Sequence, residues 1–172
     1  MDISGASTYE GASALIWQNG NANNTTEMNQ KFRIEKASGN YYYIKYAKSN
    51  QCLDVYNGEM SNETDIIQWP HHGADNQLWQ IEKTADGYYT IRSKLNGLYM
   101  DVYKCDMSNG TNVQCYQWCQ LIMNPRQLYL FVKSVILNQS LWFGVMEGSH
   151  GKDSGDWDTE FSRASGRELF LR

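Results

Sequence analysis

Three aspartates in this chain are each followed, 15 positions later, by an aromatic residue. The pairs are Asp2 with Trp17, Asp54 with Trp69, and Asp101 with Tyr116. A carboxylate can accept hydrogen bonds from two hydroxyl groups, and an aromatic ring removes an apolar surface from water. Each pair could therefore hold a ligand that carries adjacent hydroxyls beside a face of C–H bonds. The alternatives are that the aspartates only cap hairpin turns and that the tryptophans belong to the core.

The spacing of these pairs indicates a threefold internal repeat. Successive repeats are offset by 52 and then 47 positions, whether counted on the aspartates or on the aromatic residues. Short apolar alternations separated by Asn, Gly, Ser and Thr predict strands joined by tight turns. Segments 41–44 and 88–91 precede an aspartate segment and predict a fourth strand per repeat. Three four-stranded units predict an all-β fold, the β-trefoil, because three units are too few for a propeller.

The bulk composition argues against nucleic-acid and membrane partners. The chain has 172 residues, which suits one domain with its own core, and a net charge of −4 without a run of Lys or Arg. A phosphate backbone requires clustered cations, so we expect no nucleic acid as a partner. No apolar stretch approaches the roughly 20 residues that cross a bilayer, so we expect no membrane insertion.

Each repeat ends in a Gln-x-aromatic motif, and this motif carries a resemblance to a known family. The three motifs are Gln30-Lys31-Phe32, Gln77-Leu78-Trp79 and Gln127-Leu128-Tyr129, two of them preceded by Asn. With the spaced aspartates and aromatic residues, the chain from Met1 to about Leu130 resembles the ricin B-type lectins, which include the bacterial family-thirteen carbohydrate-binding modules. The resemblance implies a β-trefoil whose Gln-x-aromatic rings point inward.

The resemblance also implies one sugar-binding site in each repeat. Its residues, carried over by position, are Asp2, Trp17 and Asn29 for the first site, Asp54, Trp69 and Asn76 for the second, and Asp101, Gln114 and Tyr116 for the third. A carboxamide can donate to one sugar hydroxyl and accept from another, which fixes the orientation of the ring. The family assigns a bracing role to the three repeat glutamines, Gln30, Gln77 and Gln127.

The sequence departs from the family pattern at several positions. Arg126 stands where the third repeat should have Asn, so that site is expected to be altered or inactive. The counterparts of Gln114 are Leu15 and Ile67, which removes one polar contact from the first two sites. The intra-repeat disulfide of the family would join Cys52 to the position of His71, and is therefore expected to be absent. The four cysteines could form up to two disulfides or none.

We expect neither a metal, another cofactor nor catalysis. The four cysteines do not have zinc-site spacing, and His71-His72 have no third ligand at a suitable distance in the sequence, so we interpret them as a surface loop. Glycoside hydrolysis needs two carboxyl groups in one cleft. The repeat aspartates instead belong to three separate sites, and none has an evident acidic partner.

The two ends of the chain do not fit the repeat. The strand that corresponds to 41–44 is missing before Asp2, and the pattern stops after Leu130. We therefore divide the chain into a trefoil domain, 1–130, and a tail, 131–172, which is partly strand-like and then mobile. One apolar segment of the tail, 131–137 or 141–145, could fold back to replace the missing strand.

From the sequence we expect a secreted, non-catalytic module that binds galactose-like or xylan-like sugars. Its expected partners are mono-, oligo- or polysaccharides and a covalently linked catalytic domain, such as a glycoside hydrolase. Several weak sites on one rigid body would gain avidity on a polymer. The alternatives are the glycan-binding subunit of a toxin or haemagglutinin, and a trefoil protease inhibitor that acts through a surface loop.

Overall fold

The computed structural model describes residues 1–18, 28–85, 89–117, 130–131 and 144–145 of the chain. This part consists of short strands and one-turn 3-10 helices. The strands are β1 (Asp2–Ile3), β2 (Ala14–Leu15), β3 (Phe32–Lys36), β4 (Tyr41–Tyr46), β5 (Cys52–Val55), β6 (Thr64–Trp69), β7 (Trp79–Lys83), β8 (Tyr89–Ser93), β9 (Tyr99–Val102), β10 (Val113–Tyr116), β11 (Leu130–Phe131) and β12 (Gly144–Val145). The 3-10 helices are η1 (Ser4–Ala6), η2 (Met28–Gln30), η3 (Tyr56–Gly58), η4 (Asp75–Gln77) and η5 (Tyr103–Cys105).

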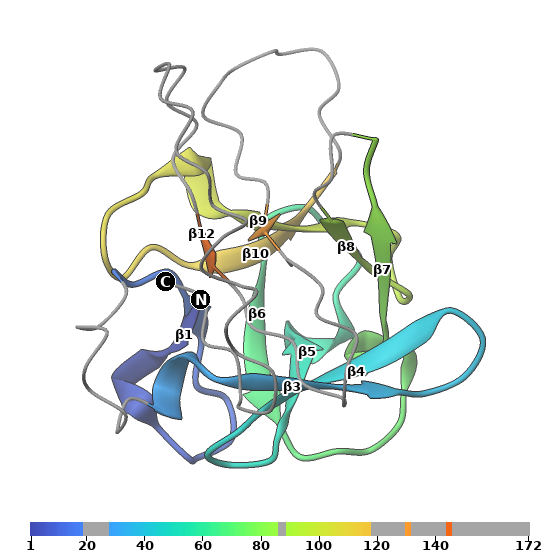
Figure 1. The fold of residues 1–172 in the computed structure, drawn as a ribbon, viewed down its shortest axis with the longest axis horizontal. Helices are drawn as coiled ribbons and strands as arrows, with labels where there is room; N and C mark the ends of the chain where they lie inside the picture. The colour runs from blue at the N-terminus through green and yellow to red at the C-terminus, as the bar shows by residue number, and fades with distance from the viewer. Residues whose placement is uncertain (19–27, 86–88, 118–129, 132–143, 146–172) are drawn as a thin grey trace, which may run out of the picture.

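Seven of the strands form a closed ring of antiparallel pairs (Figure 1). The order around the ring is β4-β5-β6-β10-β9-β8-β7, and β7 pairs again with β4. Strand β3 continues the ring as the hairpin partner of β4, and the β1–β2 pair joins it through the bridges Leu15–Asn112 and Ser13–Ile67. Closure leaves few free edges for pairing with other chains.

The backbone repeats with the threefold spacing of the sequence. Each aspartate strand runs into a 3-10 turn that contains a left-handed residue, namely Gly5 (φ 60°), Asn57 (φ 51°) and Lys104 (φ 52°). The contacts between repeats recur as well. The amide N–H groups of Gly11, Glu63 and Gly110 donate to the carbonyls of Gln68, Cys115 and Ile16, at 2.8, 2.9 and 2.9 Å. Three equivalent units around one axis confirm the predicted all-β fold, the β-trefoil.

The rings of the Gln-x-aromatic motifs belong to the core, as the resemblance implied. Phe32 and Trp79 are 1% and 0% exposed, and Phe32 packs on the buried Tyr46 with ring centroids 5.7 Å apart. Trp79 also donates from Nε1 to the carbonyl of Leu53 at 3.1 Å. This hydrogen bond fixes the ring of one strand against the strand that carries Asp54. The third motif, at Gln127, lies outside the described residues.

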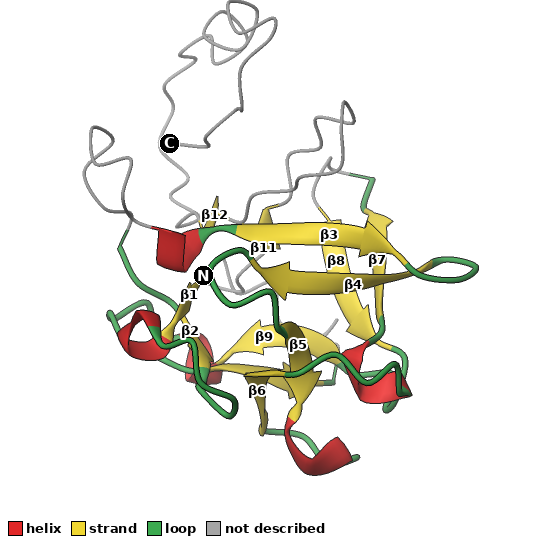
Figure 2. Ribbon diagram, turned by 90° about the horizontal axis from the view of Figure 1, so that it is seen from below, coloured by secondary structure: helices red, strands yellow, loops and turns green. Residues whose placement is uncertain are grey.

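The structure describes one further pair of short antiparallel strands, β11 and β12. Strand β11 follows β10 as β7 follows β6, and it pairs with β12 in the antiparallel register Leu130↔Val145 and Phe131↔Gly144. The hairpins β3–β4 and β7–β8 join the corresponding strands elsewhere. The β11–β12 pair therefore has the same place in the order of strands as the pairs β3–β4 and β7–β8. Figure 2 shows the fold from below, with the neighbouring strands β3 and β4 on one side of it.

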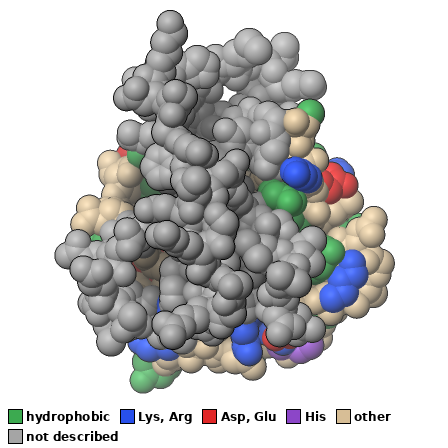
Figure 3. All heavy atoms as spheres, in the orientation of Figure 1, with side chains coloured by type: hydrophobic (Ala, Val, Ile, Leu, Met, Phe, Trp, Pro, Cys, Tyr) green, Lys and Arg blue, Asp and Glu red, His purple; other side chains and the backbone are tan. Residues whose placement is uncertain are grey.

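The surface carries charges of both signs. On the face drawn in Figure 3, the visible Lys and Arg side chains of the described residues lie apart and not in one basic patch. In β4 the alternation of buried and half-buried residues begins at Ile44, because Tyr41, Tyr42 and Tyr43 are all half-buried. Among the described residues, no helix is long and apolar enough to span a membrane.

Candidate functional site

The second repeat holds the most completely connected of the three candidate sites. Asp54 lies on β5 and is only 3% exposed, and both of its carboxylate oxygens accept hydrogen bonds. Asn76 Nδ2 donates to Oδ1 at 2.7 Å, and Gln77 Nε2 donates to Oδ2 at 2.8 Å. Both amides come from η4, which places two consecutive side chains beside the strand. The predicted partners Asp54 and Asn76 are thus in direct contact.

The loop before η4 contributes a residue that sequence reasoning did not assign to the site. His72 is exposed, and its Nε2 lies 3.1 Å from Asp54 Oδ2. Gln77 holds this loop in place, because its Oε1 accepts from the His72 backbone N–H at 3.0 Å and its Nε2 donates to the Pro70 carbonyl at 2.9 Å. Gln77 therefore has the bracing position that the resemblance implied. The loop expected for His71-His72 is present, but it forms one wall of the site.

Trp69 provides the exposed aromatic surface beside Asp54. It ends β6, its side chain is 37% exposed, and its strand neighbour across β5 is Cys52, two residues from Asp54. A methyl group at Gly11 would lie 3.8 Å from the Cζ3 atom of Trp69. The ring of the second repeat therefore rests against a hairpin of the first, and its solvent-facing side is free for a flat ligand.

The first site repeats this arrangement. Asp2 is 4% exposed and its Oδ2 accepts from Asn29 Nδ2 at 2.7 Å and from Gln30 Nε2 at 3.2 Å. Gln30 also donates to the Gln18 carbonyl at 3.1 Å, a bracing contact like that of Gln77. Trp17 is 50% exposed and rests against the third repeat, where a methyl group at Gly110 would lie 3.7 Å from the ring. The tryptophans of these two sites are thus surface residues and not part of the core.

The third site has a different set of contacts. Asp101 is half-buried and faces Gln114 across the β9–β10 pair, with Gln114 Nε2 3.3 Å from Asp101 Oδ2. Gln114 is 3% exposed, whereas Tyr116 at the end of β10 is half-buried. Arg126 and Gln127 lie outside the described residues. The structure therefore brings together Asp101 and Gln114, as predicted. In this site one amide contacts the aspartate, whereas in the second site two amides and a histidine do so.

The three site carboxylates share one electrostatic feature. Burial raises the pKa of Asp2, Asp54 and Asp101 above the ordinary value of 3.8, and hydrogen bonds from the neighbouring amides oppose the rise. A buried carboxylate that is held by amide donors on one side is suited to accept further donors, such as hydroxyl groups, from a ligand. Because burial disfavours the charged form of these carboxyl groups, the free energy of unfolding depends on pH.

This cost gives a testable pH dependence for Asp101. A carboxyl group with a raised folded-state pKa contributes stability below its unfolded value, near 3.8, and loses that contribution as the pH rises through the folded value. Asp101→Asn removes the titration and keeps an acceptor for Gln114. We expect the unfolding free energy of the variant to increase relative to wild type as the pH rises above about 3.8, as measured by urea unfolding at several pH values. A difference that moves the other way would contradict this.

The cysteines and histidines of the described residues do not form a metal site. No group of three His, Cys, Asp or Glu side chains in this part of the chain could hold a metal ion. Cys52, Cys105 and Cys115 are free thiols, and Cys119 lies outside the described residues. Burial raises the pKa of Cys52 to about 11 and that of Cys115 to about 12, so these two thiols stay protonated near neutral pH.

Comparison with known proteins places this geometry in a family. The family described as ricin-type beta-trefoil lectin domain-like matches residues 28–116. Among solved structures, the designed threefold symmetric protein ThreeFoil shares 30% identity at a TM-score of 0.64, covering 69% of this chain and 81% of its own. No curated protein sequence matches at a significant level.

Two larger proteins contain a similar domain. The exo-beta-1,3-galactanase 1,3Gal43A of Clostridium thermocellum is 26% identical at a TM-score of 0.63, over 69% of this chain. The match spans only 24% of the galactanase. A mosquitocidal holotoxin is 21% identical at a TM-score of 0.60 over 84% of this chain and 15% of its own, which shows a shared fold.

Proposed function

Because this chain belongs to the ricin-type β-trefoil lectin family and is a carbohydrate-binding domain, we propose that it binds galactose-containing glycans without catalysis. The observation that carries this proposal is the pairing of a buried, amide-held carboxylate with an exposed tryptophan in both the first and the second repeat. The carboxylate and amide can bind adjacent sugar hydroxyls, and the tryptophan can cover the C–H face of the ring.

The choice of galactose over xylan rests on the galactanase. That enzyme acts on a β-1,3-linked galactan and carries a domain with this fold at 26% identity. By analogy, this domain is an appendage of a secreted enzyme and holds that enzyme on its polymeric substrate. Three weak sites on a rigid body gain avidity on a polymer, because binding at one site raises the effective concentration of the chain at the others.

A glycan array tests the proposal. The array carries galactosides, β-1,3-galactan, xylan and animal cell-surface glycans, and is probed with wild type and with the triple variant Asp2→Asn, Asp54→Asn, Asp101→Asn. We expect signal on galactosides that the triple variant loses, because an asparagine turns one hydroxyl acceptor of each site into a donor. Circular dichroism and thermal unfolding establish that the variant is folded.

Other outcomes of the array point elsewhere. Signal on xylan alone would overturn the choice of sugar, and signal on cell-surface glycans alone would favour the toxin or haemagglutinin role. A folded wild-type chain that binds no glycan would contradict the proposal, and assays of protease inhibition would then test the remaining alternative.

A further inference from the structure

Each site aspartate is the first of three side chains that are cross-strand partners on neighbouring strands, and this row of three differs between the repeats. In the third repeat, Gln114 of β10 lies between Asp101 of β9 on one side and Asp65 of β6 on the other, each as its direct cross-strand partner. Cross-strand partners place their side chains on the same face of a sheet. Asp65 belongs to the second repeat, so this polar row crosses from one repeat into the next.

The equivalent rows of the other two sites are interrupted by an aliphatic side chain. Their members are Ser13, Ile67 and Asp54 for the second site, and Asn112, Leu15 and Asp2 for the first. Ile67 and Leu15 are 5% and 8% exposed, and neither can hydrogen-bond to a ligand. Among the described residues, the third site is therefore the one whose row is polar throughout and extends into the next repeat.

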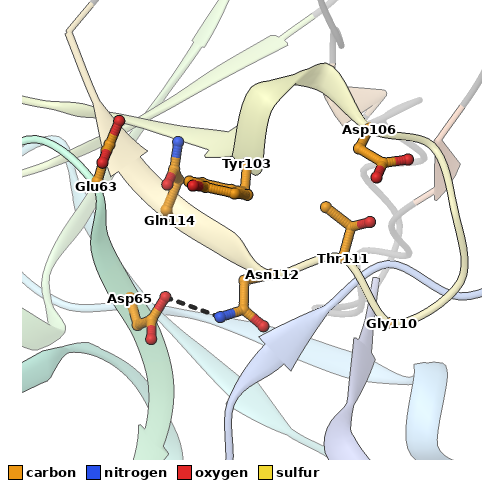
Figure 4. Close-up of a pocket in the computed structure, with 8 residues that line it drawn as sticks. All are labelled: Glu63, Asp65, Tyr103, Asp106, Gly110, Thr111, Asn112 and Gln114. Carbon is orange, nitrogen blue, oxygen red and sulfur yellow. Dashed lines mark hydrogen bonds between the residues drawn. The ribbon is translucent and has the colours of Figure 1, made fainter.

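An open cavity of about 340 Å³ lies at this continuation. Ligand pockets commonly have volumes of roughly 300 to 1,000 Å³. Its walls are formed by Glu63 and Asp65 of the second repeat and by Tyr103, Asn112 and Gln114 of the third, with further residues of the third repeat at the far end (Figure 4). The walls thus combine carboxylates, amides and one aromatic ring, the groups that make up the lectin sites themselves.

Gln114 connects the cavity to the third site. Its side chain is 97% buried, since 3% is exposed, and its Nε2 is in hydrogen-bond contact with Asp101. Figure 4 draws one hydrogen bond among the residues of the cavity wall, from Asn112 Nδ2 to Asp65 Oδ1. The Gln114 amide oxygen has no partner among them. One amide can therefore contact a ligand group at Asp101 and a second group in the cavity.

Glu63, at the cavity wall, has a backbone conformation that is unusual for a residue with a side chain. Its φ is 64°, whereas the equivalent residues of the other repeats, Gly11 and Gly110, have φ of 81° and 89°. Glycine adopts this left-handed conformation without a steric penalty, and glutamate does not. The second repeat thus has a carboxylate side chain at the cavity wall where the other two repeats have no side chain.

We propose that the third site is an extended site that binds a neutral disaccharide, with one ring at Asp101 and Tyr116 and the next ring in the cavity between the second and third repeats. This inference rests on the proposed function. Glu63 and Asp65 accept hydrogen bonds from the hydroxyls of the second ring, and Tyr103 lies against its apolar face. The carboxylates repel a second ring that carries a carboxylate of its own, so acidic disaccharides are rejected.

Titration calorimetry on a background that isolates the third site tests this. Asp2→Asn and Asp54→Asn together disable the other two sites and keep Trp17, whose ring rests on Gly110 of the cavity wall. The probes are galactose, digalactosides with 1,3, 1,4 and 1,6 links, and a disaccharide of glucuronic acid and galactose. We expect at least one digalactoside to bind about tenfold more tightly than galactose, as one additional charge-assisted hydrogen bond allows. The acidic disaccharide should show no such gain.

The added substitutions Asp65→Ser and Glu63→Gly install the residues of the first repeat at the cavity wall. Each should reduce the affinity for the digalactoside toward that of galactose and leave the affinity for galactose unchanged. Ser13→Ala, at the equivalent position beside the second site, is the matched control and should change neither. A digalactoside gain that is absent, or that survives both substitutions, would overturn the extended site while galactose binding still supports the lectin function. A folded wild-type chain that binds no galactoside would instead remove the proposed function, and this inference with it.

Discussion

Replacing Asp54 with alanine is expected to lower the free energy of unfolding by about 2 to 3 kcal/mol and to abolish binding at the second site. The carboxylate is the common acceptor for Asn76, Gln77 and His72, at 2.7, 2.8 and 3.1 Å. Gln77 is fully buried, and a buried donor that loses its acceptor keeps the cost of its desolvation. The contact to the Pro70 carbonyl offsets only part of this loss.

Urea unfolding measures the change, with Asp75→Ala as the matched control. Asp75 is an exposed aspartate on the neighbouring 3-10 helix, and its ion pair with Lys94, at 2.8 Å, is partly exposed to solvent. Such pairs contribute about 0 to 1 kcal/mol. Equal stability of the two variants would show that the network around Asp54 does not hold the loop of the second site.

The double variant Trp17→Ala, Trp69→Ala is expected to weaken binding to a galactan polymer by about a hundredfold or more while the chain stays folded. The two residues are 50% and 37% exposed and are not part of the buried core. Each ring also packs against a neighbouring hairpin, so we expect each truncation to lower the free energy of unfolding by about 1 kcal/mol. With two of three sites disabled the chain loses its multivalent attachment, and avidity accounts for factors of roughly 10² to 10⁴.

Surface plasmon resonance on immobilised galactan, together with thermal unfolding, separates the two effects. Met60→Ala is a suitable control, because Met60 is 63% exposed and is not part of any candidate site. It should bind the polymer as wild type does. Polymer binding by the double variant at wild-type strength would show that the tryptophans are not the ligand-facing surfaces.

The fold was predictable because its signals repeat three times. The spacing of the aspartates and aromatic residues fixes which strands are equivalent, and the Gln-x-aromatic motifs identify Phe32 and Trp79 as core residues, which they are. The contacts of Asp2 with Asn29 and of Asp54 with Asn76 also follow from position in the repeat. In these cases the surroundings of a residue follow from its position within the repeat.

The features that could not be predicted depend on single loops and on contacts between repeats. His72 lies against Asp54 because Gln77 holds the preceding backbone, and a sequence pattern carries no information on where that loop turns. The row from Asp65 through Gln114 to Asp101 joins strands of different repeats, and appears only when the pairing of β6 with β10 is known. One signal for it was available, since Gln114 stands where the other repeats have Leu15 and Ile67.

Each of the two tryptophans packs against a hairpin of another repeat, and this packing links sugar binding to the folding of the whole chain. Trp69 rests on Gly11 of the first repeat and Trp17 on Gly110 of the third. Neither surface exists until the repeats have closed on one another, so a single excised repeat would not display a complete site.

A sugar that binds only the closed ring must raise the free energy of unfolding of the entire domain, by about 2.7 kcal/mol when its free concentration is 100 times Kd. A ligand at the first site stabilises the contact between the first and third repeats, which are furthest apart along the chain. A bound glycan would therefore stabilise the closed ring as a whole, and not only the repeat that it contacts.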